Sequence, residues 1–489
     1  ADIGGLAWVA AALFFFAMGQ APSAAWGAAA GAVYGAAFFG PLLWYISAFG
    51  LIPWALVVVL EAIFYAAAGC LSAYLNRMAR VGWRIGGLAA IWVLIEYLRA
   101  HRGALSLSLG SSYYSQWSLP PILQLASIGG SLLISFFIGL LGAALATAAA
   151  AWLPGNWLRP PGWGPRQARD AARALLAAYA LFFVAYFWGA SVYRAGSKAI
   201  ASMPETAGFD VGFVQAAEQR HHVITQEEAV RSTEAYFYLT ELLPAGLDLV
   251  VWPETAVPLV LEEAEDYRAR IARMAREKGS FMLVGTNERA PGGRLYNTLL
   301  LVSPNGAVID RYRKVHLIIF GEYVPGRDRW KFLHRFPIRP YDYAPGDGFK
   351  VLEASRMKFG VLICFEALFP EYTRWLCQHG AEFIVIATSD AWAAKTYEVA
   401  QHSRTAIFRA VEARRYVVRV GTHGESMVIT PVGECLSVIP IGESGTQRER
   451  IFPIKSLSPY HRVGDWPLLC LCLILWAGAC YHTLASGRE

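Results

Sequence analysis

Apolar positions along the chain follow two different patterns. Long apolar stretches fill the first 195 residues and return at the carboxyl end, whereas short apolar runs alternate with charged helical ones from about 208 to 455. Crossing a bilayer takes about 20 mostly apolar residues. We expect seven spans, at about 4–20, 23–47, 50–75, 84–101, 120–151, 171–193 and 464–484. The pattern predicts a multi-span α-helical bundle over 1–195, an extramembrane domain over 208–455 and a last helix over 464–485.

The middle region has the hydropathy pattern of a layered α/β domain. Short runs rich in β-branched residues predict buried strands, and amphipathic stretches between them predict helices. We expect strands at 209–216, 247–255, 281–288, 357–366, 381–390, 416–424 and 426–434, and helices at 225–243, 260–278 and 396–413. Segment 296–314 is predicted to be a hairpin turning at Pro-Asn-Gly, and 442–450 a surface loop. Together these elements predict a mixed sheet covered by helices.

Composition supports the membrane assignment. The chain is 55% hydrophobic and 16% charged, whereas soluble domains carry about 25% charged residues. A net charge of +6 over 489 residues, without a basic run, does not argue for nucleic acid, and we expect no nucleic-acid partner. The seven cysteines lack the regular spacing of a disulfide framework. Few charges fall within spans, which argues against a transporter, and Glu61 and Glu96 are the exceptions.

The short loops predict an orientation in the membrane. Arginines gather in the loops at 76–83 and 152–171, whereas 102–119 is Ser-rich and nearly uncharged. Lys and Arg mark cytoplasmic loops, so we expect 208–455 on the opposite side of the membrane. Whether a short apolar segment precedes Ala1, or 4–47 divides differently, stays open.

Three reactive side chains stand where predicted strands end. Glu254 follows "LVVWP", Lys314 follows the second hairpin strand, and Cys364 follows "FGVLI". In open α/β sheets, sites lie beyond the carboxyl ends of strands. Thiolate chemistry requires a base for the thiol proton and a positive group or N–H for the oxyanion. These three residues would supply a nucleophile, a base and a cation if the fold brings them together.

The surroundings of Cys364 leave two interpretations open. A helix predicted from about residue 367 would lower the thiol pKa, and the backbone N–H of Phe365 could donate to an oxyanion. Free cysteine is also among the most buried residue types, so a lone cysteine after an apolar strand is more often structural. Only the combination with neighbouring sequence favours a nucleophile.

That neighbouring sequence carries a family resemblance. "VVWPETAVP", "DRYRKVHLIIFGEYVP" and "GVLICFEALFP" resemble the Glu, Lys and Cys motifs of the nitrilase superfamily. "YNTLLLVSP", "SDAW" and "QHSRTAIFRAVEARR", with "LGSSYYSQWSLPPILQLASIGG" in the apolar half, are similar to its membrane branch, the apolipoprotein N-acyltransferases. The likeness extends from about residue 30 to the last span.

The resemblance implies a nitrilase-like α-β-β-α sandwich outside the inner membrane of a bacterium. It implies Cys364 as nucleophile, Glu254 as general base and Lys314 as oxyanion stabiliser, with Glu322 and Glu366 in support. It also implies a reaction in which a phospholipid acyl chain passes, through a cysteine thioester, to the diacylglyceryl-cysteine that begins a lipoprotein. We expect no metal, no other cofactor and a monomer.

Several positions depart from the family pattern and keep alternatives open, among them Ala393 and Ala394, which stand where Phe-Gly is common. Phe365 stands where Tyr is common, Ser389 and His423 where Asn is common, and Ile224 where a pocket tryptophan is expected. The triad is intact, but the acceptor is undetermined. A membrane-bound amidase or hydrolase, a paralogous acyltransferase with another acceptor, and a catalytically silent scaffold are the alternatives.

The loop at 317–345 is a candidate lid. It mixes aromatic with basic side chains: Trp330, Phe332, Phe336, Arg327, Arg329, Lys331 and Arg335. Such a mixture fits an interface where aromatics enter lipid and cations meet phosphates. An ordinary solvated loop is the alternative.

Overall fold

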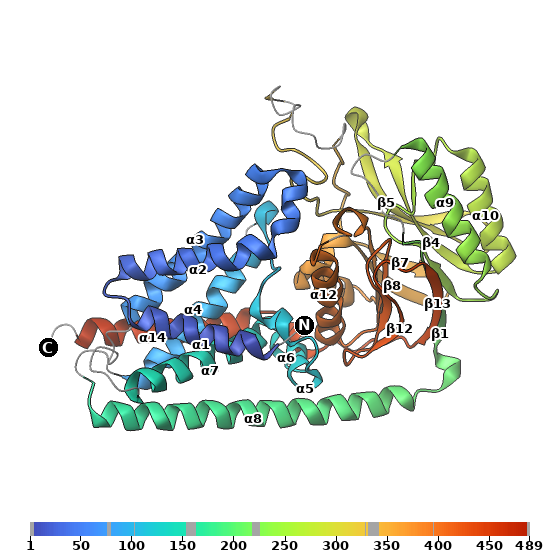
Figure 1. Ribbon diagram of the computed structural model, residues 1–489. Coiled ribbons are helices and arrows are strands. Elements are labelled where there is room, and N and C mark those ends of the chain that lie inside the picture. The colour runs from blue at the N-terminus through green and yellow to red at the C-terminus, as the bar shows by residue number, and fades with distance from the viewer. Residues whose placement is uncertain are drawn as a thin grey trace. The chain divides into compact units, whose positions relative to one another are not determined.

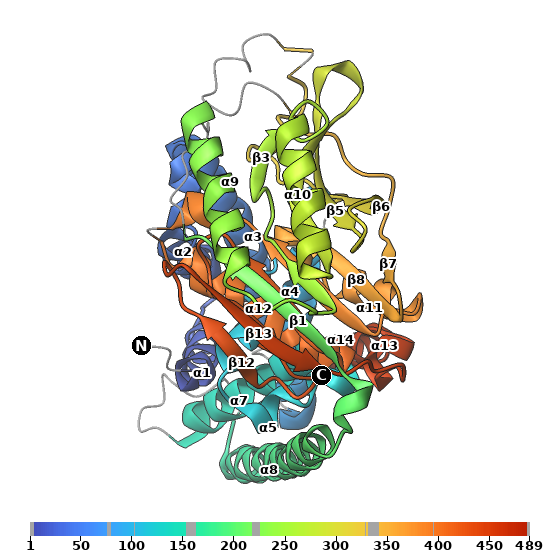
Figure 2. The ribbon, with the colours of Figure 1, turned by 90° about the vertical axis from the view of Figure 1, so that its right-hand side faces the viewer.

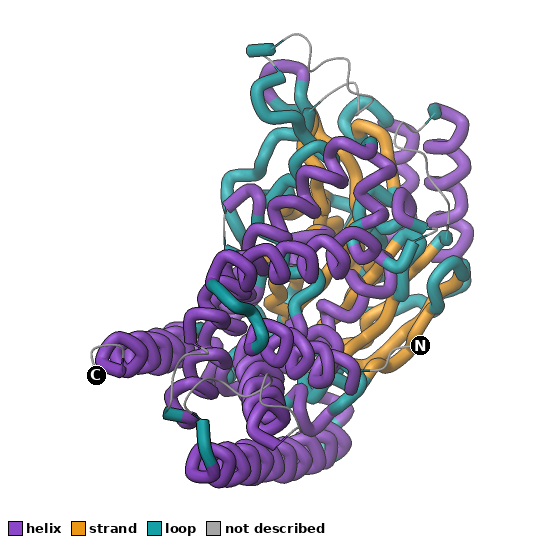
Figure 3. Tube along the Cα trace, turned by 60° about the vertical axis from the view of Figure 1, so that its left-hand side comes forward, coloured by secondary structure: helices purple, strands orange, loops and turns teal. Residues whose placement is uncertain are grey.

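The computed structural model describes residues 4–75, 80–101, 103–152, 163–217, 225–327, 329–330, 342–394 and 396–486. The chain divides into two compact units, one of residues 1–195 with 463–489 and the other of residues 196–462. Among the described residues, the first unit is helical and the strands lie in the second (Figure 3).

Seven long helices make up most of the described helical unit (Figure 1). They are α1 (Gly5–Gly19), α2 (Ala24–Leu42), α3 (Leu51–Leu75), α4 (Val81–Ala100), α7 (Ser131–Trp152), α8 (Pro165–Ala201) and α14 (Trp466–Ser486). Short turns of helix connect them: η1 (Trp44–Phe49), η2 (Gly103–Leu105), η3 (Ser112–Gln116), α5 (Pro120–Leu123) and α6 (Ala126–Gly129). Small residues bring α2 and α3 together, since Gly31 lies against the backbone of Tyr65 where a side chain would collide.

Five described helices, rather than the expected seven, are long and apolar enough to cross a membrane: α3, α4, α7, α8 and α14. Helix α1 has 15 residues, fewer than a span needs. Helix α2 has 19 residues but is rich in Ala and Gly, which lowers its hydropathy. The expected span at 120–151 is also wrong, because Gly130 interrupts it at a φ of +70° and α7 begins one residue later. Helix α8 has 37 residues and extends beyond 171–193 at both ends.

The second unit is a sandwich of two sheets. The first sheet has the order β13-β1-β2-β4-β5-β6, with β3 paired to β4, and the second has the order β12-β11-β10-β9-β8-β7. The first contains β1 (Phe209–Gln215), β2 (Leu249–Val251), β3 (Val257–Val260), β4 (Phe281–Arg289), β5 (Leu295–Val302), β6 (Val308–Arg313) and β13 (Gly445–Ile451). The second contains β7 (Val351–Ala354), β8 (Met357–Ile363), β9 (Phe383–Thr388), β10 (Val417–Gly421), β11 (Ser426–Ile429) and β12 (Cys435–Ile439).

Apolar alternation builds the core between the sheets. Val211 and Phe213 of β1 pack in the same cluster as Val361 and Ile363 of β8, because every second residue of a strand faces the same side. On the outer face of the first sheet lie α9 (Gln226–Glu241) and α10 (Glu265–Lys278), packed around the fully buried Trp252 (Figure 2). Helices α11 (Pro370–Gln378) and α12 (Glu398–Ala413) lie against the second sheet. The expected α-β-β-α sandwich is confirmed.

Two local expectations are wrong. The helix expected from 260 begins at Glu265, because 257–260 is paired with β4 as β3. The expected surface loop at 442–450 is largely strand β13, antiparallel to β1. This strand is at the end of its sheet, and its polar side chains make cross-strand contacts such as Arg450 with Asp210. Polar edge strands are difficult to distinguish from loops by hydropathy alone.

Helix α13 (Pro459–Val463) ends the described part of this unit. The turns η5 (Glu205–Ala207), η6 (Pro291–Gly293), η8 (Cys364–Leu368) and η9 (Ala391–Ala393) complete its described helical elements. One of them, η8, begins at the candidate nucleophile.

Candidate active site

Strand direction explains why Glu254 and Lys314 come together. Strands β2 and β4 are parallel, and β5 is antiparallel to both β4 and β6, so β2 and β6 run the same way. Glu254 follows β2 and Lys314 follows β6, and both therefore leave the sheet at the same edge. Cys364 follows β8 of the facing sheet and interacts electrostatically with both. The structure thus brings the three predicted residues together.

A buried ammonium group lies between two carboxylates. The Nζ of Lys314 is 2.9 Å from Oε1 of Glu322 and 3.4 Å from Oε1 of Glu254. Burial alone would lower the pKa of Lys314, but the two carboxylates hold that pKa well above its usual value. Lys314 is therefore a fixed positive charge, 1% exposed.

The carboxylates are themselves held by further donors. The side-chain amide of Asn297 donates to Oε1 of Glu254 at 2.6 Å, and the backbone N–H of Ser389 donates to Oε2 of Glu254 at 2.6 Å. The backbone N–H of Ile318 donates to Oε2 of Glu322 at 2.9 Å. Asn297 was not predicted as a site residue, and Ser389 contributes its backbone rather than its side chain to Glu254.

The loops that carry these residues adopt unusual backbone conformations. Cys364 has a φ of +55°, Thr255 beside Glu254 has +48°, and Phe320 two residues before Glu322 has +62°. Left-handed conformations cost non-glycine residues of order 1–3 kcal/mol each and cluster at functional sites. Gly285 of β4 makes room for one of these loops, since a Cβ there would lie 2.9 Å from the Cα of Glu254.

The thiol of Cys364 is protonated at rest, contrary to the expectation that its pKa would be lowered. Burial raises the pKa of Cys364 well above its usual value, and Glu254 raises it further, while Lys314 and the hydroxyl of Thr388 oppose the rise. The short turn η8, rather than an α-helix, begins at this residue, and α11 starts only at Pro370. Attack by this thiol at neutral pH therefore depends on a base or on the small fraction of thiolate.

Glu366 connects the nucleophile loop to the lysine loop. One oxygen accepts from the backbone N–H of Val315 at 2.7 Å and of His316 at 3.0 Å, and the other accepts from Ile363 N–H and Tyr312 O–H at 2.8 Å. Burial raises the pKa of Glu366, and these donors oppose that rise. Glu366 thus joins the Cys364 loop to the Lys314 loop, and its supporting role in the chemistry stays a prediction.

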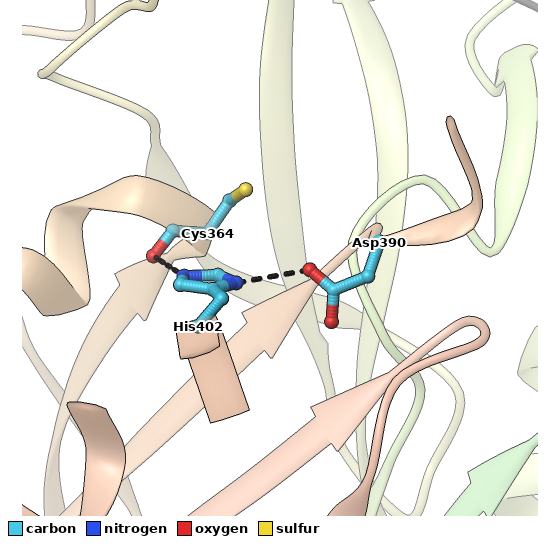
Figure 4. A group of neighbouring side chains, drawn as sticks. All are labelled: Cys364, Asp390 and His402. Carbon is cyan, nitrogen blue, oxygen red and sulfur yellow. Dashed lines mark hydrogen bonds and ion pairs between the residues drawn. The ribbon is translucent and has the colours of Figure 1, made fainter. Parts of the chain in front are cut away.

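A second polar cluster lies behind Cys364 (Figure 4). His402 Nε2 lies 3.2 Å from the carbonyl oxygen of Cys364, and His402 Nδ1 lies 2.9 Å from Oδ1 of Asp390. Their possible metal-ligand atoms and the thiol sulfur lie within 4.8 Å of one another. A carbonyl oxygen has no proton to donate, so the Nε2 of His402 must carry the proton of this hydrogen bond. A protonated Nε2 has no lone pair with which to bind a metal ion. The arrangement fits a hydrogen-bonded cluster better than a metal centre.

The remaining predicted pocket residues are partly described. The Phe365 ring stacks on the His402 ring with centroids 5.3 Å apart, and the Nδ1 of His423 is 3.2 Å from the carbonyl oxygen of Ala217. Ile224 lies outside the described residues.

The candidate lid is described only in part. Residues 328 and 331–341 of the 317–345 loop lie outside the described residues. In its described part, Arg327 pairs with Asp342 at 2.9 Å and the Trp330 side chain is half exposed. The lid interpretation stays a prediction.

Comparison with known proteins defines the class of this protein. The carbon-nitrogen hydrolase family model matches residues 212–449, and the model of the apolipoprotein N-acyltransferase N-terminal domain matches residues 1–144. With five described helices long and apolar enough to cross a bilayer, the fold and site define a multi-pass membrane protein that carries a carbon-nitrogen hydrolase domain. A solved nitrilase-superfamily structure from Saccharomyces cerevisiae, at 20% identity and a TM-score of 0.38, covers 50% of this chain and 91% of its own.

Curated relatives identify the family. An apolipoprotein N-acyltransferase of Geobacter metallireducens is 30% identical over 479 residues, covering 94% of this chain and 87% of the relative. One of Azotobacter vinelandii is 30% identical over 438 residues, covering 88% of this chain and 79% of the relative. The chain belongs to the apolipoprotein N-acyltransferase family, and the prediction of a membrane-bound acyltransferase is confirmed at that level.

Proposed function

We propose that this protein transfers an acyl chain from a phospholipid to the N-terminal amine of a diacylglyceryl-lipoprotein, with Cys364 as the covalent carrier. The observation that carries the proposal is the buried Glu254–Lys314–Glu322 cluster within electrostatic range of a thiol on a left-handed turn. The names of the curated relatives support the lipoprotein acceptor.

In the first half-reaction, Cys364 attacks the phospholipid. Glu254 takes the thiol proton, and the sulfur forms a bond with the ester carbonyl carbon. The ammonium of Lys314 and the backbone N–H of Phe365 stabilise the oxyanion. The carbon–oxygen bond then breaks, Glu254 returns the proton to the leaving alkoxide, and a lysophospholipid departs from the thioester.

In the second half-reaction, an amine attacks the thioester. The nitrogen forms the amide bond, Glu254 accepts a proton from that nitrogen, and the carbon–sulfur bond breaks. Glu254 then reprotonates the departing thiolate, which restores the resting thiol. No proton is gained or lost over the cycle.

The membrane arrangement belongs to the same proposal. We place the hydrolase domain on the outer side of the bacterial inner membrane, because the arginine-rich loops at 76–83 and 152–171 favour the cytoplasm. We also propose that the protein acts as a monomer.

Intact-mass measurement tests the proposal. The purified protein is incubated with phospholipid alone, and an acyl adduct on Cys364 is expected that the Cys364→Ala variant lacks. Adding a diacylated lipopeptide should then discharge the adduct into a triacylated product. Release as free fatty acid in spite of the lipopeptide would favour a hydrolase, and a persistent lack of any adduct would reject acyl transfer.

A further inference from the structure

The peptide group that follows the nucleophile is held from its carbonyl side. His402 Nε2 donates to the carbonyl oxygen of Cys364 at 3.2 Å. In a trans peptide, the C=O of one residue and the N–H of the next belong to one plane and point in opposite directions. The described peptide bonds include no cis bond. A donor that fixes the Cys364 carbonyl therefore fixes the direction of the Phe365 N–H.

Hydrogen-bond partners indicate that His402 is an imidazolium. Its Nε2 faces a carbonyl oxygen, and its Nδ1 faces Oδ1 of Asp390 at 2.9 Å. Burial alone would raise the pKa of Asp390, but the Arg419 guanidinium, 2.6 Å from its Oδ2, and His402 hold that pKa below the usual range. Both ring nitrogens thus face acceptors that carry no proton, so both must donate.

The surroundings of His402 keep this charge local and dry. His402, Asp390 and Arg419 are each 1% exposed, and the Phe365 ring covers one face of the imidazole. The hydroxyl of Thr388 donates to Oδ1 of Asp390 at 2.9 Å. The other acid in this cluster, Glu398, is buried, and burial with the nearby Asp390 charge raises its pKa well above the usual value. In such an environment hydrogen bonds polarise one another strongly.

We propose that His402 is a positioning residue for the oxyanion donor: its imidazolium binds the Cys364 carbonyl, aims the Phe365 N–H at the reacting carbonyl and strengthens that N–H as a donor. Arg419 and Asp390 hold His402 in place from behind. The inference rests on the proposed function, in which the Phe365 N–H stabilises the oxyanion. Preorganised donors of this kind reduce the barrier only for steps that develop negative charge on oxygen.

Two reactions of the same thiol separate this role from a structural one. Thioester formation from phospholipid develops an oxyanion, whereas alkylation of Cys364 by chloroacetamide occurs at a saturated carbon and develops none. Both rates are measured for the parent protein and for the His402→Gln and His402→Leu variants. Single-turnover intact mass gives the rate of thioester formation, and peptide mapping gives the rate of alkylation. Loss of one oxyanion donor costs about 10²–10³ in rate. We expect thioester formation to fall about 100-fold in His402→Leu and about 10-fold in His402→Gln, which keeps a donor, with alkylation within about twofold of the parent.

Several outcomes would overturn the inference. An equal fall in both rates means that His402 places the thiol itself, and unchanged thioester formation means that His402 has no part in the step. Equal losses in the Gln and Leu variants would show that the donor is irrelevant. His461→Gln is the matched control, since His461 is another buried histidine of the same unit and lies on α13. Its two rates should equal those of the parent.

Folding failure and failure of the proposed function remain distinguishable from these results. If His402→Leu does not fold, Asp390→Asn replaces it, and the same split is expected because the ring loses its charged acceptor. If the parent forms no thioester from phospholipid, the proposed acyl transfer is rejected, and the two rates are then compared with a small activated ester as the acylating reagent. If the His402 variants lose the rate of acylation by that ester but keep the rate of alkylation, the role of His402 is supported. If both rates change equally, the role is rejected.

Discussion

Among the described residues, a buried cluster of two carboxylates and one cation can be compared between the two units. In the helical unit, Arg99 of α4 pairs with Glu61 of α3, and Glu96 lies one turn before Arg99. In the sandwich, Lys314 pairs with Glu254 and Glu322. All six side chains are almost fully buried. Two buried carboxylates around one cation are therefore not enough to distinguish a structural cluster from a reactive one.

The two clusters differ in what carries them and what lies beside them. Arg99 donates to the carbonyl of Leu109, and Glu96 accepts from Ser112 N–H and from Ser135 O–H of α7. These contacts tie α4 to the 103–116 segment and to α7. The sandwich cluster instead stands on loops with left-handed residues and interacts with a thiol. Strained supports and an adjacent nucleophile, more than buried charge, identify the reactive cluster.

The largest effect is expected from Glu254→Gln, which should change two rates in opposite directions. Without its base, thioester formation should fall by about 10²–10⁴. Glu254 raises the pKa of Cys364, so its neutralisation lowers that pKa, and thiolate appears at lower pH. Chloroacetamide alkylation should therefore be faster at neutral pH, with its pH profile displaced toward acid. An unchanged pH profile of alkylation would show that Glu254 does not affect the pKa of the Cys364 thiol.

Lys314→Met should damage both reactivity and stability. Loss of the cation leaves two carboxylates facing each other in a buried site, at a cost of about 3–5 kcal/mol in the free energy of unfolding. Loss of oxyanion stabilisation should lower thioester formation by about 10²–10³ per folded molecule. Thermal unfolding and single-turnover intact mass measure the two effects. A normal rate in the folded fraction would make Lys314 a purely structural cation.

Arg99→Met should damage stability alone, which is the most direct way to break the comparison. It leaves Glu61 buried without its guanidinium partner, and we expect a similar loss of about 3–5 kcal/mol. Thioester formation per folded molecule should stay within about twofold of the parent. The double variant Arg99→Met with Glu61→Leu should recover part of the stability, because apolar replacement of a buried pair is often neutral. A rate loss beyond the unfolded fraction would give the helical cluster a role in the chemistry.

The fold was predictable where hydropathy carries the signal. The strand before Glu254 is apolar throughout, the strand before Cys364 is apolar except for Lys358, and both lie within their expected ranges, whereas β13 is polar and has the hydropathy of a loop. The expectation of one span over 120–151 is wrong because the left-handed turn at Gly130 leaves little trace in hydropathy. The two-sheet arrangement came from the family resemblance, since strand patterns alone gave only a mixed sheet.

The site was predictable for residues in recognisable motifs and not for their distant partners. Glu254, Lys314 and Cys364 lie together as expected, although their chemical roles remain proposals. Asn297 contacts Glu254 across 43 positions of sequence, and His402 contacts the Cys364 carbonyl across 38, so only the fold reveals these pairs. The thiol pKa was predicted in the wrong direction, because sequence could not show that burial outweighs a helix beginning six residues later.

Asn297→Ala should give the smallest loss of stability and of thioester formation among these variants. It tests whether a single hydrogen bond to the base affects the chemistry. The Asn297 amide lies 2.6 Å from Glu254 Oε1 and 3.4 Å from Glu322 Oε1, so it orients the base. Removing one hydrogen bond to a charged group costs about 1.5–3 kcal/mol. We expect a modest loss of stability and about a tenfold loss in thioester formation, since part of that energy orients Glu254 in the transition state.

The matched control lies in the other cluster, where Ser135 donates to Oε2 of Glu96 at 2.5 Å. Ser135→Ala removes a comparable hydrogen-bond donor from the buried carboxylate of Glu96. The described hydrogen bonds of Glu96 come from Ser112 and Ser135, and none involves a thiol. Its stability should fall by a similar amount, while its rate of thioester formation per folded molecule equals that of the parent. Parallel thermal unfolding and single-turnover intact mass on both variants measure the contrast. If both variants lose rate equally, the two clusters do not divide structure from chemistry; if neither does, Asn297 supports only the fold.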